Sequence, residues 1–246
     1  MIRGAAAEAA GIEARLREVG TPERAMQEQR YLKSSLQFVG ATVWQIRAVV
    51  KRYLAEADTL DHDALIALVD ALWAQPVHER RMAAVAILEE RSSLLGAGDL
   101  PVVERLIRES LTWALIDGIA ADVVGDILVR DEATTVRTLD RWAADADFWV
   151  RRSALLAWLR PLRMGAPLDR FLTYADRMLE EREFFIRKAI GWVLRDVGKR
   201  RPESVVDWLA PRTHRASGVT MREATKYLPR ADRERLLLAY RERRPA

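Results

Sequence analysis

Segments with helical spacing of apolar residues follow one another along almost the whole of this 246-residue chain. Apolar residues recur every three or four positions, whereas the apolar/polar alternation typical of strands is hard to find. Only 12 glycines and 9 prolines interrupt the pattern, so the linkers are short and neighbouring helices should pack antiparallel. The sequence therefore predicts an all-α protein.

Capping residues place the expected helices. Thr21-Pro22-Glu23 has the form of an N-cap, a first-turn proline and an acidic first turn, and Thr42 and Asp61 or Asp63 open the next two helices. Asp99-Leu100-Pro101 begins another helix. The ranges expected to be helical include 43–57, 61–73, 77–94, 112–130, 132–144, 148–159, 168–181, 184–197, 203–209, 220–228 and 232–243.

An internal repeat indicates how these helices are arranged. Residues 148–154 resemble residues 184–189 at an offset of 36, and residues 80–83 match residues 151–154 at an offset of 71, about two such periods. A period in the thirties built from helix pairs is typical of an α-solenoid of the HEAT or armadillo type, which has a concave inner surface. Because no linker interrupts the array, we expect a single HEAT-like repeat domain over residues 1–246.

The repeat brings four charged residues into one register. Arg81, Asp117, Arg152 and Lys188 are 36, 35 and 36 residues apart and should occupy the same place on successive repeats. Three cations along one line are what a concave basic groove for a nucleic-acid backbone requires. Spacing alone also fits ordinary solvated helix residues. The carboxylate of Asp117 should stay ionised beside such cations.

Composition excludes several kinds of site. The chain has no cysteine, only three distant histidines and no glycine-rich phosphate loop, so we expect no metal and no cofactor. Lys and Arg total 40 against 36 Asp and Glu, and all but five of the 40 are arginine. Codon bias in a GC-rich genome explains this excess as well as a polyanionic partner does.

Two of the eight tryptophans are candidates for function. Trp113 shares a helix face with Asp117, and Trp192 lies four residues after Lys188 and three before Arg195. Indole faces attract cations, and a fixed carboxylate stabilises a developing positive charge, as in glycosidic bond cleavage. Four other tryptophans lie among apolar neighbours and should be core residues, namely Trp73, Trp142, Trp158 and Trp208.

Over roughly residues 25–228 the chain resembles the AlkD-type DNA glycosylases of the HEAT-like DNA alkylation repair family. The similarity is densest over residues 183–195, where the sequence reads EFFIRKAIGWVLR. It also includes RYLK at residues 30–33 with Phe38 and Gly40, LWAQPVHE at 72–79, Trp113 and Asp117 with Gly125-Asp126, WVRRSA at 149–154, and REATK at 222–226.

The resemblance implies hydrolytic release of cationic N3- and N7-alkylated purines from duplex DNA, without a base-flipping pocket and with room for bulky adducts. It makes Asp117 the catalytic carboxylate, with Trp113 and Trp192 against the sugar of the damaged nucleotide and Arg152 on the adjacent backbone. Together with the repeat register, it gives seven further expected DNA contacts: Tyr31, Lys33, Arg81, Lys188, Arg195, Arg222 and Lys226.

The chain departs from the family pattern at two places. Thr42-Val43 stands where Thr-Pro is common, and Thr112 replaces a second tryptophan before Trp113. Two other functions stay open: a non-catalytic HEAT-like binder of distorted or branched DNA, and a HEAT scaffold for proteins. The Trp113/Asp117 pair argues against the former, and the basic register against the latter.

The expected location follows from what the sequence lacks. No apolar run reaches the roughly 20 residues of a membrane span, and the first residues contain no apolar signal core. We therefore expect a protein of the bacterial cytoplasm that acts at the nucleoid and has no membrane partner. We also expect a monomer.

Overall fold

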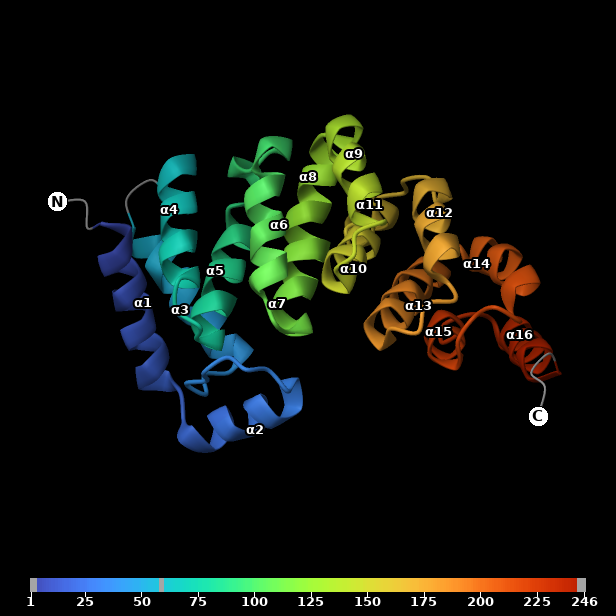
Figure 1. Ribbon diagram of the computed structural model, residues 1–246, viewed down its shortest axis with the longest axis horizontal. Helices are drawn as coiled ribbons and strands as arrows, with labels where there is room; N and C mark the ends of the chain where they lie inside the picture. Colours follow the sequence, from blue (N-terminus) through green and yellow to red (C-terminus); the bar gives the residue numbers. More distant parts are fainter. Residues whose placement is uncertain (1–3, 58–59, 243–246) are drawn as a thin grey trace. The chain divides into compact units, whose positions relative to one another are not determined.

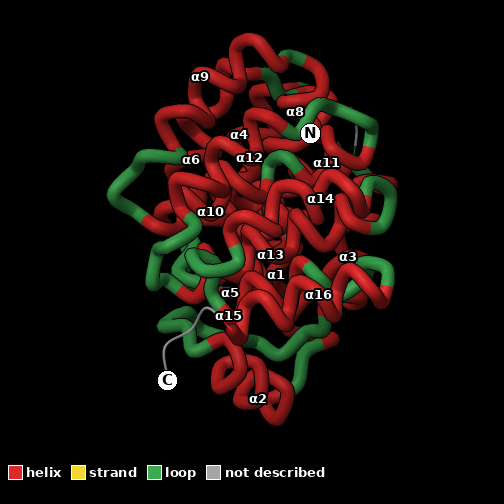
Figure 2. Tube along the Cα trace, turned by 90° about the vertical axis from the view of Figure 1, so that its right-hand side faces the viewer, coloured by secondary structure: helices red, strands yellow, loops and turns green. Residues whose placement is uncertain are grey.

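The computed structural model describes residues 4–57 and 60–242. Within them all regular secondary structure is helical (Figure 2), and the only strand-like pairing is an isolated parallel bridge between Gln37 and Val77. This confirms the all-α prediction. The solenoid with a concave basic groove stays a prediction.

The chain divides into two compact units, residues 1–127 and 128–246 (Figure 1). The expectation of a single domain over 1–246 remains a prediction beside this division. The first unit contains α1 (Ala5–Val19), α2 (Pro22–Leu32), α3 (Val43–Glu56), α4 (His62–Trp73), α5 (His78–Glu90), η1 (Ser92–Leu94), η2 (Ala97–Asp99), α6 (Leu100–Glu109), α7 (Trp113–Gly118) and η3 (Ile119–Val124).

The boundary between the two units falls within α8 (Gly125–Arg130), and the second unit begins there. It contains α9 (Glu132–Trp142), α10 (Phe148–Leu156), α11 (Leu159–Arg163), α12 (Asp169–Met178), α13 (Phe184–Gly198), α14 (Pro202–Leu209), η4 (Ala210–Arg212), α15 (Gly218–Ala224) and α16 (Arg230–Glu242).

In the first unit, α1 packs on α3 and α4, and α5 packs on both of these and on α7. Leucines spaced by three and four residues on α4 form the middle of this core, and Leu65, Leu68 and Leu72 are fully buried. By contrast, α2 stands apart from the other helices of its unit (Figures 1 and 2). Its position therefore depends on the loops at its two ends.

In the second unit, α13 is the central helix. It packs on α10, α11, α14 and, most extensively, α15. Trp142, Trp158, Phe171 and Tyr174 fill the core around it. The four tryptophans expected in the core are indeed buried, whereas Trp113 and Trp192 are half-exposed.

The expected helix boundaries agree with the structure to within a few residues at most places. The capping residues explain this agreement: Thr42 forms a capping box with Gln45, and the Asp61 side chain accepts from the amide of Ala64. Residue 243, the expected end of the last helix, and residues 1–3, which bear on the signal expectation, lie outside the described ranges.

Four expected helices differ from the structure. The helix expected over 77–94 is α5 followed by the 3-10 turn η1, and the helix expected over 220–228 ends with α15 at Ala224. The helix expected over 112–130 is α7 followed by the π-helical turn η3 and then α8. The helix expected over 148–159 ends at Leu156, and α11 begins at Leu159. In the described part of the chain, no helix has both the length and the apolar character needed to cross a bilayer.

Candidate nucleic-acid interface

Three of the expected site residues of the first unit lie around the start of α7. Trp113 is the first residue of this helix, and Asp117 follows one turn later, so their side chains share a face. The ring of Tyr31, at the end of α2, meets the Trp113 indole edge-on at a centroid distance of 5.8 Å. Tyr31 is 67% exposed, and Trp113 and Asp117 are half-exposed. We call Tyr31, Trp113 and Asp117 the α7 site.

The backbone is strained on both sides of this ring contact. Lys33 and Leu111 have φ values of 49° and 55°, and they are the only described non-glycine residues with positive φ. A side chain in the left-handed region costs about 1–2 kcal/mol. Lys33 lies two residues after Tyr31, and Leu111 lies two residues before Trp113. The strain is thus confined to the two segments that carry the aromatic pair.

A buried carboxylate fixes the loop that follows α2. Glu79 is 0% exposed, and its two oxygens accept hydrogen bonds from the amides of Val39 at 3.0 Å and Gly40 at 2.6 Å. Burial raises the pKa of Glu79, although these amides counteract the shift. Because α2 packs weakly, Glu79 is one of the groups that set the position of Tyr31. The LWAQPVHE motif contained this residue without indicating its role.

A second carboxylate that the sequence did not reveal lies behind α7. A Cβ atom added at Gly118 would lie 2.6 Å from Oε1 of Glu89. Burial raises the pKa of Glu89, and its 2.6 Å ion pair with Arg47 acts in the opposite direction. Gly118 follows Asp117 directly, so Glu89 packs against the backbone that presents the candidate catalytic carboxylate.

Arg81 does not lie on an open surface as the repeat register suggested. It is only 8% exposed, its guanidinium donates to the carbonyl of Glu109, and the same group lies 5.1 Å from the centroid of the Trp73 ring. These contacts tie α5 to α6 and to the core. Arg81 therefore packs within the first unit, and its expected contact with DNA stays a prediction.

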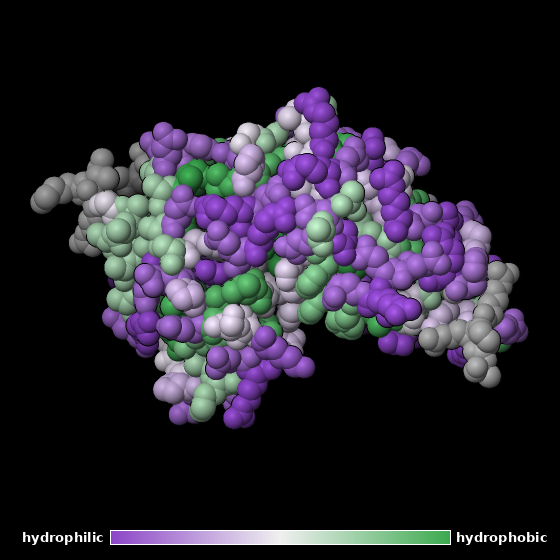
Figure 3. Space-filling view, viewed as in Figure 1, coloured by the Kyte–Doolittle hydropathy of each residue, from purple (hydrophilic) through white to green (hydrophobic). Residues whose placement is uncertain are grey.

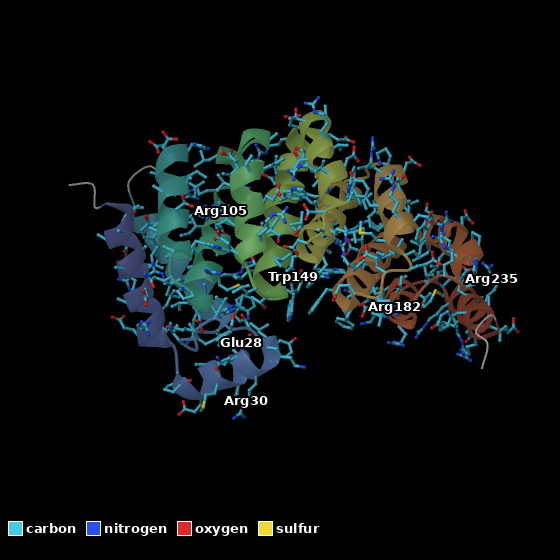
Figure 4. All side chains as sticks on the ribbon, in the orientation of Figure 1. Glu28, Arg30, Arg105, Trp149, Arg182 and Arg235 are labelled. Atoms are coloured by element: carbon cyan, nitrogen blue, oxygen red, sulfur yellow. The ribbon has the colours of Figure 1, made fainter. Side chains whose placement is uncertain are left out.

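In the second unit, Arg152 is also buried, at 2% exposure. Its Nη1 donates to the carbonyl of Phe185 at 2.6 Å, and its guanidinium lies 5.7 Å from the centroid of that ring. Phe185 in turn contacts Phe148 and Trp149, so an aromatic cluster joins the first turns of α10 and α13 (Figure 4, where Trp149 is labelled). The position of Arg152 therefore depends on the Phe185 segment.

Lys188 and Arg195 share one carboxylate, that of Glu223 on α15. Burial alone would raise the pKa of Glu223, but the hydrogen bond from Lys188 and the charge of Arg195 lower it overall. Glu223 is a site residue that sequence reasoning missed. It lies 35 residues after Lys188, which is the next position of the same repeat register, so the register contained the signal.

Gly191 explains how close this carboxylate comes to α13. A Cβ atom at Gly191 would lie 2.5 Å from Cβ of Glu223 and 3.1 Å from the carbonyl oxygen of Thr220. The absence of a side chain therefore lets α15 pack directly on α13. Trp192, the next residue, is half-exposed beside Lys188 and Arg195 on the helix surface.

Of the other expected contacts, Lys33 in the first unit and Arg222 and Lys226 in the second are exposed. Polar and charged residues cover much of the face of each unit that Figure 3 shows. In the described residues, no three histidine or acidic side chains are grouped to hold a metal ion.

The charges of the two units differ in sign. Residues 1–127 contain 14 Lys and Arg against 19 Asp and Glu, a net charge of −5, whereas residues 128–246 contain 26 against 17, a net charge of +9. The α7 site with its carboxylate thus belongs to an acidic unit. Arg152, Lys188, Arg195, Arg222 and Lys226 belong to a strongly basic one, which suits a polyanionic partner.

Comparison with solved structures places the fold. A structure described as "Predicted DNA alkylation repair enzyme from Enterococcus faecalis" is 23% identical, with a TM-score of 0.75 over 86% of this chain and 97% of that one. The alkylpurine DNA glycosylase AlkC of Pseudomonas fluorescens, bound to DNA containing an abasic site analog, is 17% identical, with a TM-score of 0.49 over 90% of this chain and 60% of that one.

No curated protein matches the sequence significantly. The sequence model of one family, described as DNA alkylation repair enzyme, matches residues 12–228, which is most of the chain. From this match we conclude that the chain belongs to the DNA alkylation repair enzyme family.

Proposed function

We propose that this protein is a DNA glycosylase of the AlkD type, which hydrolyses the N-glycosidic bond of cationic N3- and N7-alkylated purines in duplex DNA. The α7 site carries the proposal: a half-exposed indole and a carboxylate one helical turn apart, on the surface of a unit with net negative charge. Such a surface favours a group that becomes cationic.

The reaction needs little acid catalysis. An alkylated purine already carries a positive charge, so breaking the bond between C1′ and the base nitrogen releases a neutral base and leaves an oxocarbenium-like sugar. Asp117 stabilises this cation electrostatically and orients the attacking water, while the π face of Trp113 adds to the stabilisation. Addition of water to C1′ forms the abasic product and releases one proton.

The proposal does not require that the base enter a pocket. Trp113 and Asp117 are half-exposed at the surface of α7, whereas a cavity of about 290 Å³ in the second unit is lined by other residues, among them Trp158 and Pro161. Chemistry at an open surface also tolerates bulky adducts. The exposed cations of the basic second unit supply the affinity for the phosphates of the DNA.

Base release from duplex DNA that contains N7-methylguanine tests the proposal. The Asp117→Asn variant keeps the shape of the side chain and removes its charge. We expect single-turnover release to fall about 10²-fold or more, the scale of one preorganised electrostatic contact. DNA affinity should stay level or rise, because a negative charge has left a polyanion-binding surface.

Asp122→Asn is the matched control, since it makes the same charge change at an exposed position of η3. It should release base at the wild-type rate. Melting temperatures of both variants separate chemistry from folding. Normal release by Asp117→Asn would refute the assigned role, and binding of damaged DNA without any release by the wild type would favour the non-catalytic DNA binder.

A further inference from the structure

A stripe of exposed and half-exposed residues runs along α13 and ends at Lys199, the residue that follows the helix. Lys188, Trp192, Arg195 and Lys199 are spaced by four, three and four residues, which is the spacing of a single helix face. Only the first three were expected to contact DNA. We call these four residues the α13 stripe.

The stripe continues beyond α13 onto the turn after α15. Tyr227 is 50% exposed, and its ring lies between two lysines: Nζ of Lys199 is 5.2 Å from the ring centroid, and Nζ of Lys226 is 5.5 Å from it. Packing of Gly198 against Leu228 holds this turn on α13, with 3.2 Å between an added glycine Cβ and the leucine side chain. We call Lys199, Lys226 and Tyr227 the tyrosine clasp.

Cations outnumber carboxylates around the α13 stripe and the tyrosine clasp. The Asp196 carboxylate forms ion pairs with Arg163, Lys199 and Arg200, at 2.8, 3.2 and 3.9 Å. The Glu223 carboxylate is shared by Lys188 and Arg195, and Lys226 adds one more positive charge. Where α13 meets α15, Lys188, Arg195 and Lys226 surround the single carboxylate of Glu223, which leaves an excess of two positive charges and suits a polyanion.

The concentration of lysines distinguishes the α13 stripe and the tyrosine clasp from the rest of the second unit. Only five lysines occur in the whole sequence, and all three in the second unit, Lys188, Lys199 and Lys226, lie here. Codon bias toward arginine would disfavour lysine at each of these positions equally. An ammonium group is a compact point charge that binds phosphate oxygens from many directions.

We propose that the tyrosine clasp is a second site for the phosphates of duplex DNA, which extends the backbone contact made by Lys188 and Arg195. The proposal rests on the proposed function only in taking DNA as the partner. The Tyr227 ring holds both ammonium groups by cation–π attraction, so less side-chain freedom is lost when a phosphate binds, and its hydroxyl donates to a phosphate oxygen.

Equilibrium binding to undamaged duplex DNA over a range of salt concentrations tests this site. Lys199→Ala and Lys226→Ala should each lower the slope of log K against log salt by about 0.9, and affinity at about 0.1 M salt by up to about tenfold. Tyr227→Ala should weaken binding with less effect on the slope, because both charges remain. Tyr227→Phe keeps the ring and should retain more affinity than the alanine variant.

Lys51→Ala is the control, since Lys51 is an exposed lysine of the first unit. It should leave the slope unchanged, and equal melting temperatures should show that every variant folds. If Lys199→Ala and Lys226→Ala bind with the wild-type slope, or if the wild type does not bind duplex DNA, the proposal is wrong.

This outcome is separable from that of the glycosylase test. The clasp variants should lose the same factor of affinity for undamaged and damaged duplexes, whereas Lys51→Ala should bind both duplexes and release base as the wild type does. A lower rate at saturation without weaker binding would make the clasp part of the lesion site and overturn the proposal. A protein that binds through the clasp but releases no base would refute only the glycosylase function.

Discussion

His78 shows how burial acts on a single residue. It is 5% exposed at the start of α5, its ring stacks on Phe38 at 4.8 Å, and burial lowers its pKa to about 4. The imidazole is therefore neutral in the folded protein at neutral pH. The stacked pair belongs to the same loop contact that Glu79 fixes, next to the hydrogen bond from the amide of His78 to the carbonyl of Gln37.

The stability of the protein should consequently fall as the pH is lowered from about 6.5 to 4. In this window the unfolded chain binds a proton at His78 that the folded protein does not, which costs up to about 3 kcal/mol of unfolding free energy. His78→Phe keeps the stacking and removes the titration. Urea unfolding at pH 7, 5.5 and 4 should show the wild type losing up to about 3 kcal/mol more unfolding free energy than His78→Phe as the pH falls, whereas parallel curves would contradict this account.

Lys33 combines a backbone role and a charge at one position. It ends α2 in the left-handed conformation, where glycine is favoured. Lys33→Gly should therefore keep or raise the melting temperature, while the slope of log K against log salt for DNA falls by about one. A drop in melting temperature with unchanged DNA binding would mean that the side chain serves only to stabilise α2.

At the scale of elements, the contact between α13 and α15 depends on one missing side chain. Gly191→Ala adds a Cβ within 2.5 Å of Cβ of Glu223 and must push α15 away. We expect a loss of about 1–3 kcal/mol of unfolding free energy and weaker DNA binding, because Glu223 no longer holds Lys188 and Arg195 in place.

Gly11→Ala is the control for this prediction. Gly11 lies on an exposed face of α1 with nothing within 4 Å of an added Cβ, so the change should stabilise the protein by about 1 kcal/mol through helix propensity alone. Urea unfolding of both variants separates the two effects. Equal stabilisation of both variants would show that α15 can shift at no cost.

The π-helical turn η3 is a second feature at the scale of secondary-structure elements. It follows α7 directly and separates Asp117 from α8, and such turns often occur at functional sites. The sequence predicted one continuous helix over 112–130, because the apolar spacing is the same on both sides of the turn. Helical periodicity does not distinguish an α-helix from one that contains a single wider turn.

For the whole molecule, the division of charge matters more than the total. A net charge of +4 is small, but it is the sum of an acidic first unit and a basic second one. Under the proposed function, the basic unit attracts the DNA and the acidic unit carries the carboxylate of Asp117. The proposal thus assigns phosphate binding and stabilisation of a cationic sugar to units of opposite net charge.

The sequence by itself determined where most helices lie, that residues 4–57 and 60–242 form no sheet, and which tryptophans fill the core. These properties depend on the local spacing of apolar residues and on caps such as Thr42 and Asp61, and both can be read from neighbouring positions. The pairing of Trp113 with Asp117 was predictable for the same reason, since one helical turn joins them.

Tertiary structure decided which charged residues are exposed and what each one meets. Arg81 and Lys188 occupy equivalent positions of the repeat, yet Arg81 is buried against Trp73 and Lys188 is paired with Glu223 at the surface. The clasp around Tyr227 likewise joins residues of two turns, one after α13 and one after α15. Exposure and ion pairing depend on which helices pack together, and the spacing within one helix carries no information about its neighbours.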